Sequence, residues 1–117
     1  MTIKRIDVGA RMSQAVVYGD TVYLAGIVAD KRGGTSVADQ TTQVLARIDD
    51  LLAQAGSNKS LALKATIWLR DMAAFDEMNS VWDKWVSPGN TPVRACVESR
   101  MAAPDVLVEI QITAVLA

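Results

Sequence analysis

The sequence of 117 residues contains no histidine, and this absence removes several kinds of chemistry. Without imidazole, neither a Ser-His-Asp triad nor a Cys-His pair can be built, and the usual zinc sites lose a principal ligand. A single cysteine, Cys96, allows neither an internal disulfide nor a thiolate metal cage. We therefore expect no metal site, and chemistry limited to arginine, carboxylates, hydroxyls, one thiol and the backbone.

The sequence also lacks long apolar runs, and neither basic nor acidic residues are in large excess. No stretch reaches the roughly 20 apolar residues that a membrane span requires, and the opening MTIKRIDVGA is too polar for a signal peptide. Twelve basic residues stand against 13 acidic ones, and they are scattered rather than gathered into a positive surface for nucleic acid. We expect one soluble, cytoplasmic domain over residues 1–117, with no membrane and no nucleic-acid partner.

The spacing of apolar residues predicts the order β-β-α-β-α-β-β. A hairpin joined at Gly19-Asp20 is predicted in SQAVVYGDTVYLAG, and IKRIDV is a further strand candidate. Helical spacing follows from Ser36 onward, with Ser36 or Thr35 as a plausible N-cap and Gly56 at the C′ position. The strand LALKATIWLR leads to a second helix, which Asp71 is expected to cap and SPGN to end. The strands PVRACVES and VLVEIQITAVL close the chain.

The two predicted helices can cover one face of this α+β sheet, which leaves its other face to meet solvent or another chain. Residues expected on the inner face of the middle strand are Leu61, Leu63, Ala65, Ile67 and Leu69. The second helix should pack through Phe75, Met78, Trp82 and Trp85. The open face is predicted to carry Tyr23, Ile27, Trp68, Leu107 and Val115. Because a contiguous apolar area of this kind marks an interface, we expect a homo-oligomer.

The polar residues of TPVRACVESR are the main candidates for chemistry. Arg94, Cys96 and Glu98 alternate with apolar residues, so they share one face of the predicted strand. The next strand carries Glu109 within a mostly apolar run. Because the connection around MAAPD is short, we expect these strands to pair antiparallel, with Cys96 nearly opposite Glu109.

The pattern leaves more than one interpretation of these residues open. Arg94 and Glu109 can form a plain ion pair. Alternatively, arginine can hold a substrate carboxylate through two parallel hydrogen bonds while glutamate handles water. Cys96 is a nucleophile only if its pKa is lowered, and a buried, unreactive thiol is the commoner outcome.

These residues also carry a family resemblance. The stretch TPVRACVESRMAAPDVLVEIQITAV resembles the C-terminal signature of the YjgF/RidA family, also called the RutC family, with Arg94, Cys96 and Glu109 at matching positions. VYLAGIVA is similar to the family's early strand, with Gly26 at its glycine, and FDEMNSVWDKWV to its second helix, with Asn79 at a matching position. The resemblance covers nearly the whole chain and is closest to a smaller bacterial branch.

The resemblance implies a chorismate-mutase-like α+β fold with a mainly antiparallel sheet. It implies a homotrimer in which the sheets form an inner barrel, the helices lie outside and the pockets lie between subunits. The implied activity is the cofactor-free hydrolysis of reactive 2-imino or 2-enamino acids, such as 2-aminoacrylate, to 2-oxo acids and ammonia. In that mechanism Arg94 binds the carboxylate, and Glu109, directly or through Cys96, orients the attacking water.

Two positions depart from the family pattern. Met12 stands where many active members have a tyrosine, and Ala25 where they often have serine or threonine, so the expected pocket loses two hydroxyl groups. The alternative function is therefore a non-catalytic protein that binds small carboxylates such as 2-oxo acids through Arg94 and acts as a sensor or regulator. The nuclease or translation-inhibitor activity attached to some relatives finds little support in this composition.

Overall fold

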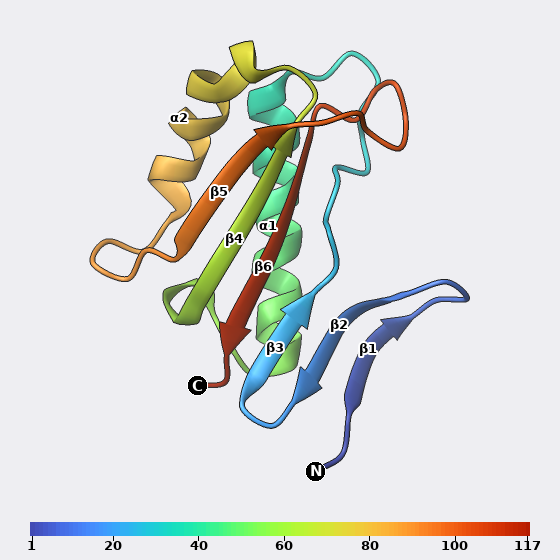
Figure 1. The fold of residues 1–117 in the computed structure, drawn as a ribbon, viewed down its shortest axis with the longest axis vertical. Coiled ribbons are helices and arrows are strands. Elements are labelled where there is room, and N and C mark those ends of the chain that lie inside the picture. The colour runs from blue at the N-terminus through green and yellow to red at the C-terminus, as the bar shows by residue number, and fades with distance from the viewer.

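The computed structural model describes residues 1–117 (Figure 1). It consists of one β-sheet with two α-helices packed on one face of that sheet. The strands are β1 (Lys4–Val8), β2 (Ser13–Tyr18), β3 (Thr21–Leu24), β4 (Ala62–Leu69), β5 (Val93–Glu98) and β6 (Val108–Val115). The helices are α1 (Val37–Ala55) and α2 (Phe75–Trp85), with 3-10 turns η1 (Lys59–Leu61) and η2 (Met72–Ala74). Neither α-helix is both long and apolar enough to cross a membrane. The predicted α+β class and element order are confirmed.

The sheet has the order β1-β2-β3-β6-β4-β5, and every neighbouring pair is antiparallel except β4 with β5. The predicted hairpin forms between β2 and β3, where Tyr18 pairs with Thr21 around Gly19. Gly19 has φ 61°, a left-handed conformation that this tight turn requires and that glycine adopts at little cost. The strand candidate IKRIDV is β1, at the sheet edge beside β2.

The predicted pairing of the last two strands is wrong. β4 lies between β5 and β6, so Cys96 pairs with Ile67 of β4, while Glu109 pairs with Trp68 of the same strand. The segment 99–107 crosses the end of β4 instead of forming a hairpin turn. Crossing one strand requires only about 10 Å, two interstrand spacings, so a short connection does not force its flanking strands to be neighbours.

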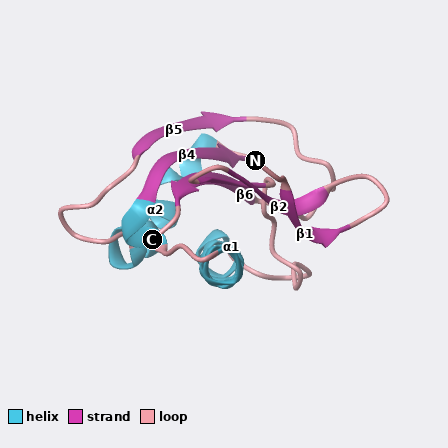
Figure 2. Cartoon of the chain, turned by 90° about the horizontal axis from the view of Figure 1, so that it is seen from below, coloured by secondary structure: helices cyan, strands magenta, loops and turns pink.

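The core lies between the helices and the sheet, with both helices on the same side in Figure 2. α1 begins after Ser36, whose side chain accepts a hydrogen bond from the backbone N–H of Asp39 at 3.1 Å, and it ends at Gly56 with φ 88°. Both predicted ends of this helix are confirmed. Its fully buried apolar residues are Val44, Leu45, Ile48, Leu51 and Leu52, which belong to one core cluster with Ile67, Leu69, Val108, Ile110 and Ile112 of the sheet.

α2 follows η2 without a break. Asp71 caps η2 rather than α2, because its side chain accepts from the backbone N–H of Ala73 at 2.9 Å. Trp82 and Trp85 are buried as predicted, and Trp85 Nε1 donates to the carboxylate of Asp49 on α1 at 3.0 Å. This bond satisfies the indole N–H and ties the two helices together.

Three side chains depart from the predicted pattern. Leu61 lies in η1, before β4 begins, and is half-buried. Leu63 is 50% exposed because a register shift between Ala62 and Lys64 interrupts the alternation at the start of β4. Ile27, expected on the open face, is buried because it forms an isolated bridge to Ile110 beyond the end of β3. Local irregularities of this kind break a period of two without leaving a clear sequence signal.

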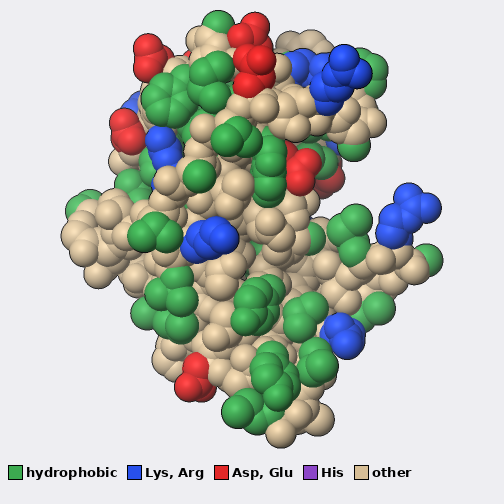
Figure 3. Space-filling view, in the orientation of Figure 1, with side chains coloured by type: hydrophobic (Ala, Val, Ile, Leu, Met, Phe, Trp, Pro, Cys, Tyr) green, Lys and Arg blue, Asp and Glu red, His purple; other side chains and the backbone are tan.

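The sheet face opposite the helices is open and largely apolar. Figure 3 views the molecule from this side and shows hydrophobic side chains spread over the strands with few charged groups among them. The exposed members are Tyr23, Val93 and Val97, and the half-buried ones are Trp68, Leu107 and Val115. The apolar character of this face agrees with the prediction, and its coverage by further copies of the chain stays a prediction.

Candidate functional site

Arg94 lies on the helix side of the edge strand β5, against α2. Its Nη1 donates to Asn79 Oδ1 at 2.7 Å, and its guanidinium carbon lies 5.3 Å from the ring centre of Trp82 and 5.7 Å from that of Phe75. These contacts fix the direction of the guanidinium. The side chain is nevertheless exposed, and no carboxylate lies within ion-pair distance. Its remaining N–H donors are therefore available to an anion.

Aromatic residues on α2 shape this cation site. Phe75, Asn79 and Trp82 are separated by four and three residues, so they form one helix face, and that face meets Arg94. The helical spacing of Phe75 and Trp82 predicts core packing alone. The i, i+4, i+7 spacing around Asn79 was the signal that could have shown their second role.

The plain ion pair between Arg94 and Glu109 does not form within the chain. Arg94 pairs with buried Ala65 of β4, so its side chain points to the helix side of the sheet. Glu109 pairs with Trp68, which lies on the open face. Because β4 separates the two strands and the side chains point to opposite faces, a single chain cannot present both groups to one small molecule.

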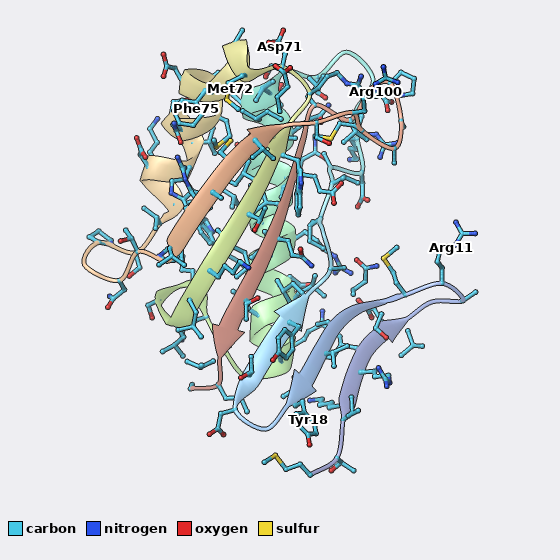
Figure 4. All side chains as sticks on the ribbon, in the orientation of Figure 1. Arg11, Tyr18, Asp71, Met72, Phe75 and Arg100 are labelled. Atoms are coloured by element: carbon cyan, nitrogen blue, oxygen red, sulfur yellow. The ribbon has the colours of Figure 1, made fainter.

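Cys96 shares the helix side of β5 with Arg94 and is partly buried against the core. It lines a hollow of about 590 Å³ together with Met72, Ala73, Phe75 and Asp76. Figure 4 shows Met72 and Phe75 where the chain enters α2, beside the end of β5. Burial raises the pKa of the Cys96 thiol above its ordinary 9.0, and the charge of Arg94 offsets only part of this rise. The protonated thiol at neutral pH disfavours a nucleophilic role.

Glu109 emerges on the open face beside Gly26, and the two residues fit one another. A Cβ atom on Gly26 would lie 2.1 Å from Glu109 Oε2 and 3.0 Å from its carboxyl carbon, so any other residue would displace the carboxylate. The backbone of Ile27 fixes this approach, because it exchanges hydrogen bonds of 2.9 and 3.1 Å with Ile110. The glycine is therefore explained by close approach and not by an unusual φ.

Met12 lies near Gly26, whereas Ala25 packs against the core. A cavity of about 500 Å³ is lined by Met12, Gln14, Gly26, Ile27, Val28, Asp30 and Arg47. Ala25 packs against the core, and its N–H donates to the carbonyl of Gln14 at 2.9 Å. The predicted site residues thus form two groups. The arginine group consists of Arg94, Asn79 and Cys96, and the glutamate group consists of Glu109 and Gly26, with Met12 nearby.

Comparison with known proteins identifies the family. Residues 2–116 match the family described as Endoribonuclease L-PSP. A RutC family protein from Haemophilus ducreyi is 45% identical over 114 residues, 97% of each chain. This chain belongs to the YjgF/RidA (RutC) family. The RutC family protein YoaB of Escherichia coli K12 is 43% identical over 97% of this chain and 98% of its own length.

Solved structures of relatives share the fold. A YjgF family member from Neisseria meningitidis is 48% identical and superposes with a TM-score of 0.97, covering 100% of this chain and 97% of its own. A protein from Salmonella typhimurium, described as a putative translation initiation inhibitor, is 41% identical with a TM-score of 0.89 over 98% of both chains. The family and fold predicted from the sequence are confirmed, whereas the functional names of these relatives differ.

Replacing Gly26 by alanine should force Glu109 out of its position. We expect Gly26→Ala to shift the carboxyl carbon resonance of Glu109 in NMR, because the added methyl group overlaps the carboxylate. The free energy of unfolding should fall by less than about 1 kcal/mol, since the displaced atoms are the end of a flexible, half-buried side chain. Gly33→Ala is the matched control, since a Cβ there meets nothing within 4 Å, and should leave the resonance in place. An unmoved Glu109 resonance in Gly26→Ala would contradict the close approach.

Alkylation of Cys96 by iodoacetamide should be slow at neutral pH and should accelerate with a midpoint above pH 9.0, because only the thiolate reacts and burial raises the thiol pKa. Arg94→Ala removes the charge that lowers this pKa and should move the midpoint further up. Arg100→Ala, a charge removed from the loop after β5 (Figure 4), is the control and should not. The rate is measured against pH, and a midpoint below pH 9.0 would show a thiolate stabilised at this site.

Proposed function

We propose that this protein hydrolyses reactive 2-imino or 2-enamino acids to 2-oxo acids and ammonia. The observation that carries the proposal is the guanidinium of Arg94, which Asn79 and two aromatic rings orient while no carboxylate neutralises it. Such a group is prepared to bind a substrate carboxylate through two parallel hydrogen bonds. Membership of the YjgF/RidA family supports this activity.

Two subunits supply each pocket of the proposed homotrimer. The arginine group and the glutamate group face opposite sides of the sheet, so only a second copy brings a Glu109 to an Arg94. The open apolar face supports this assembly, because an association that buries it removes the exposed side chains from water. Closing the sheets of the subunits into an inner barrel would leave the helices outside.

The proposed reaction needs positioning and one proton carrier. Arg94 holds the carboxylate, which places the imine carbon. Glu109 accepts a proton from water as the water oxygen bonds to that carbon, and the C=N electron pair moves to nitrogen. Glu109 then passes this proton to the nitrogen. The hydroxyl proton follows through Glu109 to the same nitrogen as the C–N bond breaks, and ammonia leaves with the 2-oxo acid. General acid–base help of this kind contributes about 10²–10⁴-fold. Cys96 acts as a protonated lining group and not as a nucleophile.

A binding protein without turnover is the second candidate, and Met12 and Ala25 favour it because they lack the hydroxyl groups found in many active relatives. In this alternative Arg94 still anchors a small carboxylate such as a 2-oxo acid. The family description as an endoribonuclease suits this site less well. The site offers one oriented guanidinium, whereas RNA binding relies on several cations spread along a phosphate backbone.

Imine hydrolysis tests the proposal directly. An amino-acid oxidase generates imino acids in situ, and their decay is followed with wild type, Arg94→Ala, Arg94→Lys and the control Arg100→Ala. Arg94→Ala should lower kcat/KM by about tenfold to a hundredfold through loss of charge-assisted hydrogen bonds. Arg94→Lys should restore only part of it, because lysine lacks the planar fork. Binding of a 2-oxo acid through Arg94 without any acceleration would support the second candidate and reject the first.

Mixing two weakened variants tests the shared pocket. Arg94→Ala and Glu109→Gln subunits are each expected to have greatly reduced activity alone, because every pocket lacks one group. After joint unfolding and refolding, about a quarter of the pockets should combine an intact Arg94 with an intact Glu109 by random assembly. Activity is compared with separately refolded variants. Recovery near zero, from trimers shown by native mass spectrometry to be mixed, would contradict a pocket built from two subunits.

A further inference from the structure

The segment 103–107, which leads directly into β6, is held from several sides. Arg70 donates from Nε to the carbonyl of Val106 at 3.0 Å and from Nη2 to that of Ala103 at 2.6 Å. Its backbone N–H donates to the carbonyl of Leu107 at 3.0 Å. Arg32 forms an ion pair with Asp105 at 2.9 Å. Although it lies outside regular secondary structure, this segment is therefore fixed by contacts to distant parts of the chain.

Gln40 of α1 makes the most enclosed of these contacts. Its side chain is completely buried, and its Nε2 donates to the carbonyl of Asp105 at 2.8 Å and to Thr35 Oγ1 at 3.1 Å. Its Oε1 accepts from the N–H of Leu107 at 3.0 Å. One carboxamide thus binds a carbonyl and an N–H on either side of Val106, which determines the path of the backbone between them.

The helix itself does not require an amide at this position. Gln40 lies on the buried stripe of α1, where an apolar side chain would avoid the cost of desolvating a carboxamide. The neighbouring Thr41 is equally buried, but its hydroxyl donates only to the carbonyl of Val37 within the same helix. The contacts of Gln40, in contrast, are directed entirely at residues outside α1.

Glu109 follows Leu107 by two residues, as the second residue of β6. Its position on the open face depends on the register of β6 against β4, where it pairs with Trp68. Because side chains alternate between faces, a slip of one residue would turn the carboxylate to the helix side. The hydrogen bonds of Gln40 at 105 and 107 fix this register at the point where the strand begins.

We infer that Gln40 is a positioning residue for Glu109, acting through the segment 103–107. The role in catalysis rests on the proposed function of Glu109, whereas the role in placing the carboxylate does not. Gln40→Met keeps the volume and helix propensity and removes all three hydrogen bonds. It should therefore loosen the start of β6 and leave the arginine group, on β5 and α2, unchanged.

Two independent measurements test the inference. In imine hydrolysis, Gln40→Met should lower kcat by about tenfold or more and change KM by less than about twofold, because displacement of a reacting group by a fraction of an ångström is costly while carboxylate binding persists. In carbon-detected NMR, the carboxyl resonance of Glu109 should shift, and amide exchange at Leu107 and Glu109 should accelerate. Thr41→Val, a matched change at an equally buried position on the same helix, should alter neither measurement.

Unchanged kcat per folded molecule together with an unmoved Glu109 resonance in Gln40→Met would overturn the inference. If the methionine variant does not fold, Gln40→Glu replaces it, since this side chain keeps the shape and the acceptor to Leu107 but loses the donor to Asp105 when ionised. The proposed function fails separately, if wild type accelerates no imine. In that case the NMR comparison alone decides whether Gln40 positions the carboxylate.

Discussion

The position of β4 between β5 and β6 is the constraint on which the arrangement of the candidate site depends. Arg94 of β5 pairs with the inward-facing Ala65 of β4, so its side chain points toward α2. Glu109 of β6 pairs with Trp68 of β4, which lies on the open face. The cation and the carboxylate therefore belong to different surfaces of one chain. A pocket that uses both groups requires an association between chains, so in this protein catalysis and assembly would be linked.

The arginine side of the pocket is prepared by the helix that packs beside it. Phe75 and Trp82 provide aromatic faces, and Asn79 takes one N–H donor, so the guanidinium is oriented without being neutralised. A carboxylate partner inside the chain would have stabilised the cation but would have competed with a ligand. Burial raises the pKa of the Cys96 thiol more than the charge of Arg94 lowers it, which disfavours the thiolate at neutral pH.

The position of Glu109 depends on backbone hydrogen bonds and on the missing side chain of Gly26. Gly26 leaves the space that the carboxylate of Glu109 occupies. The hydrogen bonds of Gln40 and Arg70 fix the segment 103–107, which precedes Glu109. Both groups are thus oriented before any ligand binds, and under the proposed function this positioning would contribute to rate. Met12 lies near Gly26 and Ala25 packs against the core, so neither residue takes part in these two devices.

Local patterns in the sequence determined the helices and strands of this protein. Helical spacing and the caps at Ser36 and Gly56 defined α1, and Gly19 defined the first hairpin, because each signal acts over a few residues. The C-terminal signature predicted the family, which the comparisons confirm, and it supplied the candidate residues of the site. Only the tertiary structure decided that β5 pairs with β4 and not with β6. A segment as short as 99–107 can close a hairpin or cross one strand at a similar cost in chain entropy, so packing of the whole sheet makes that choice.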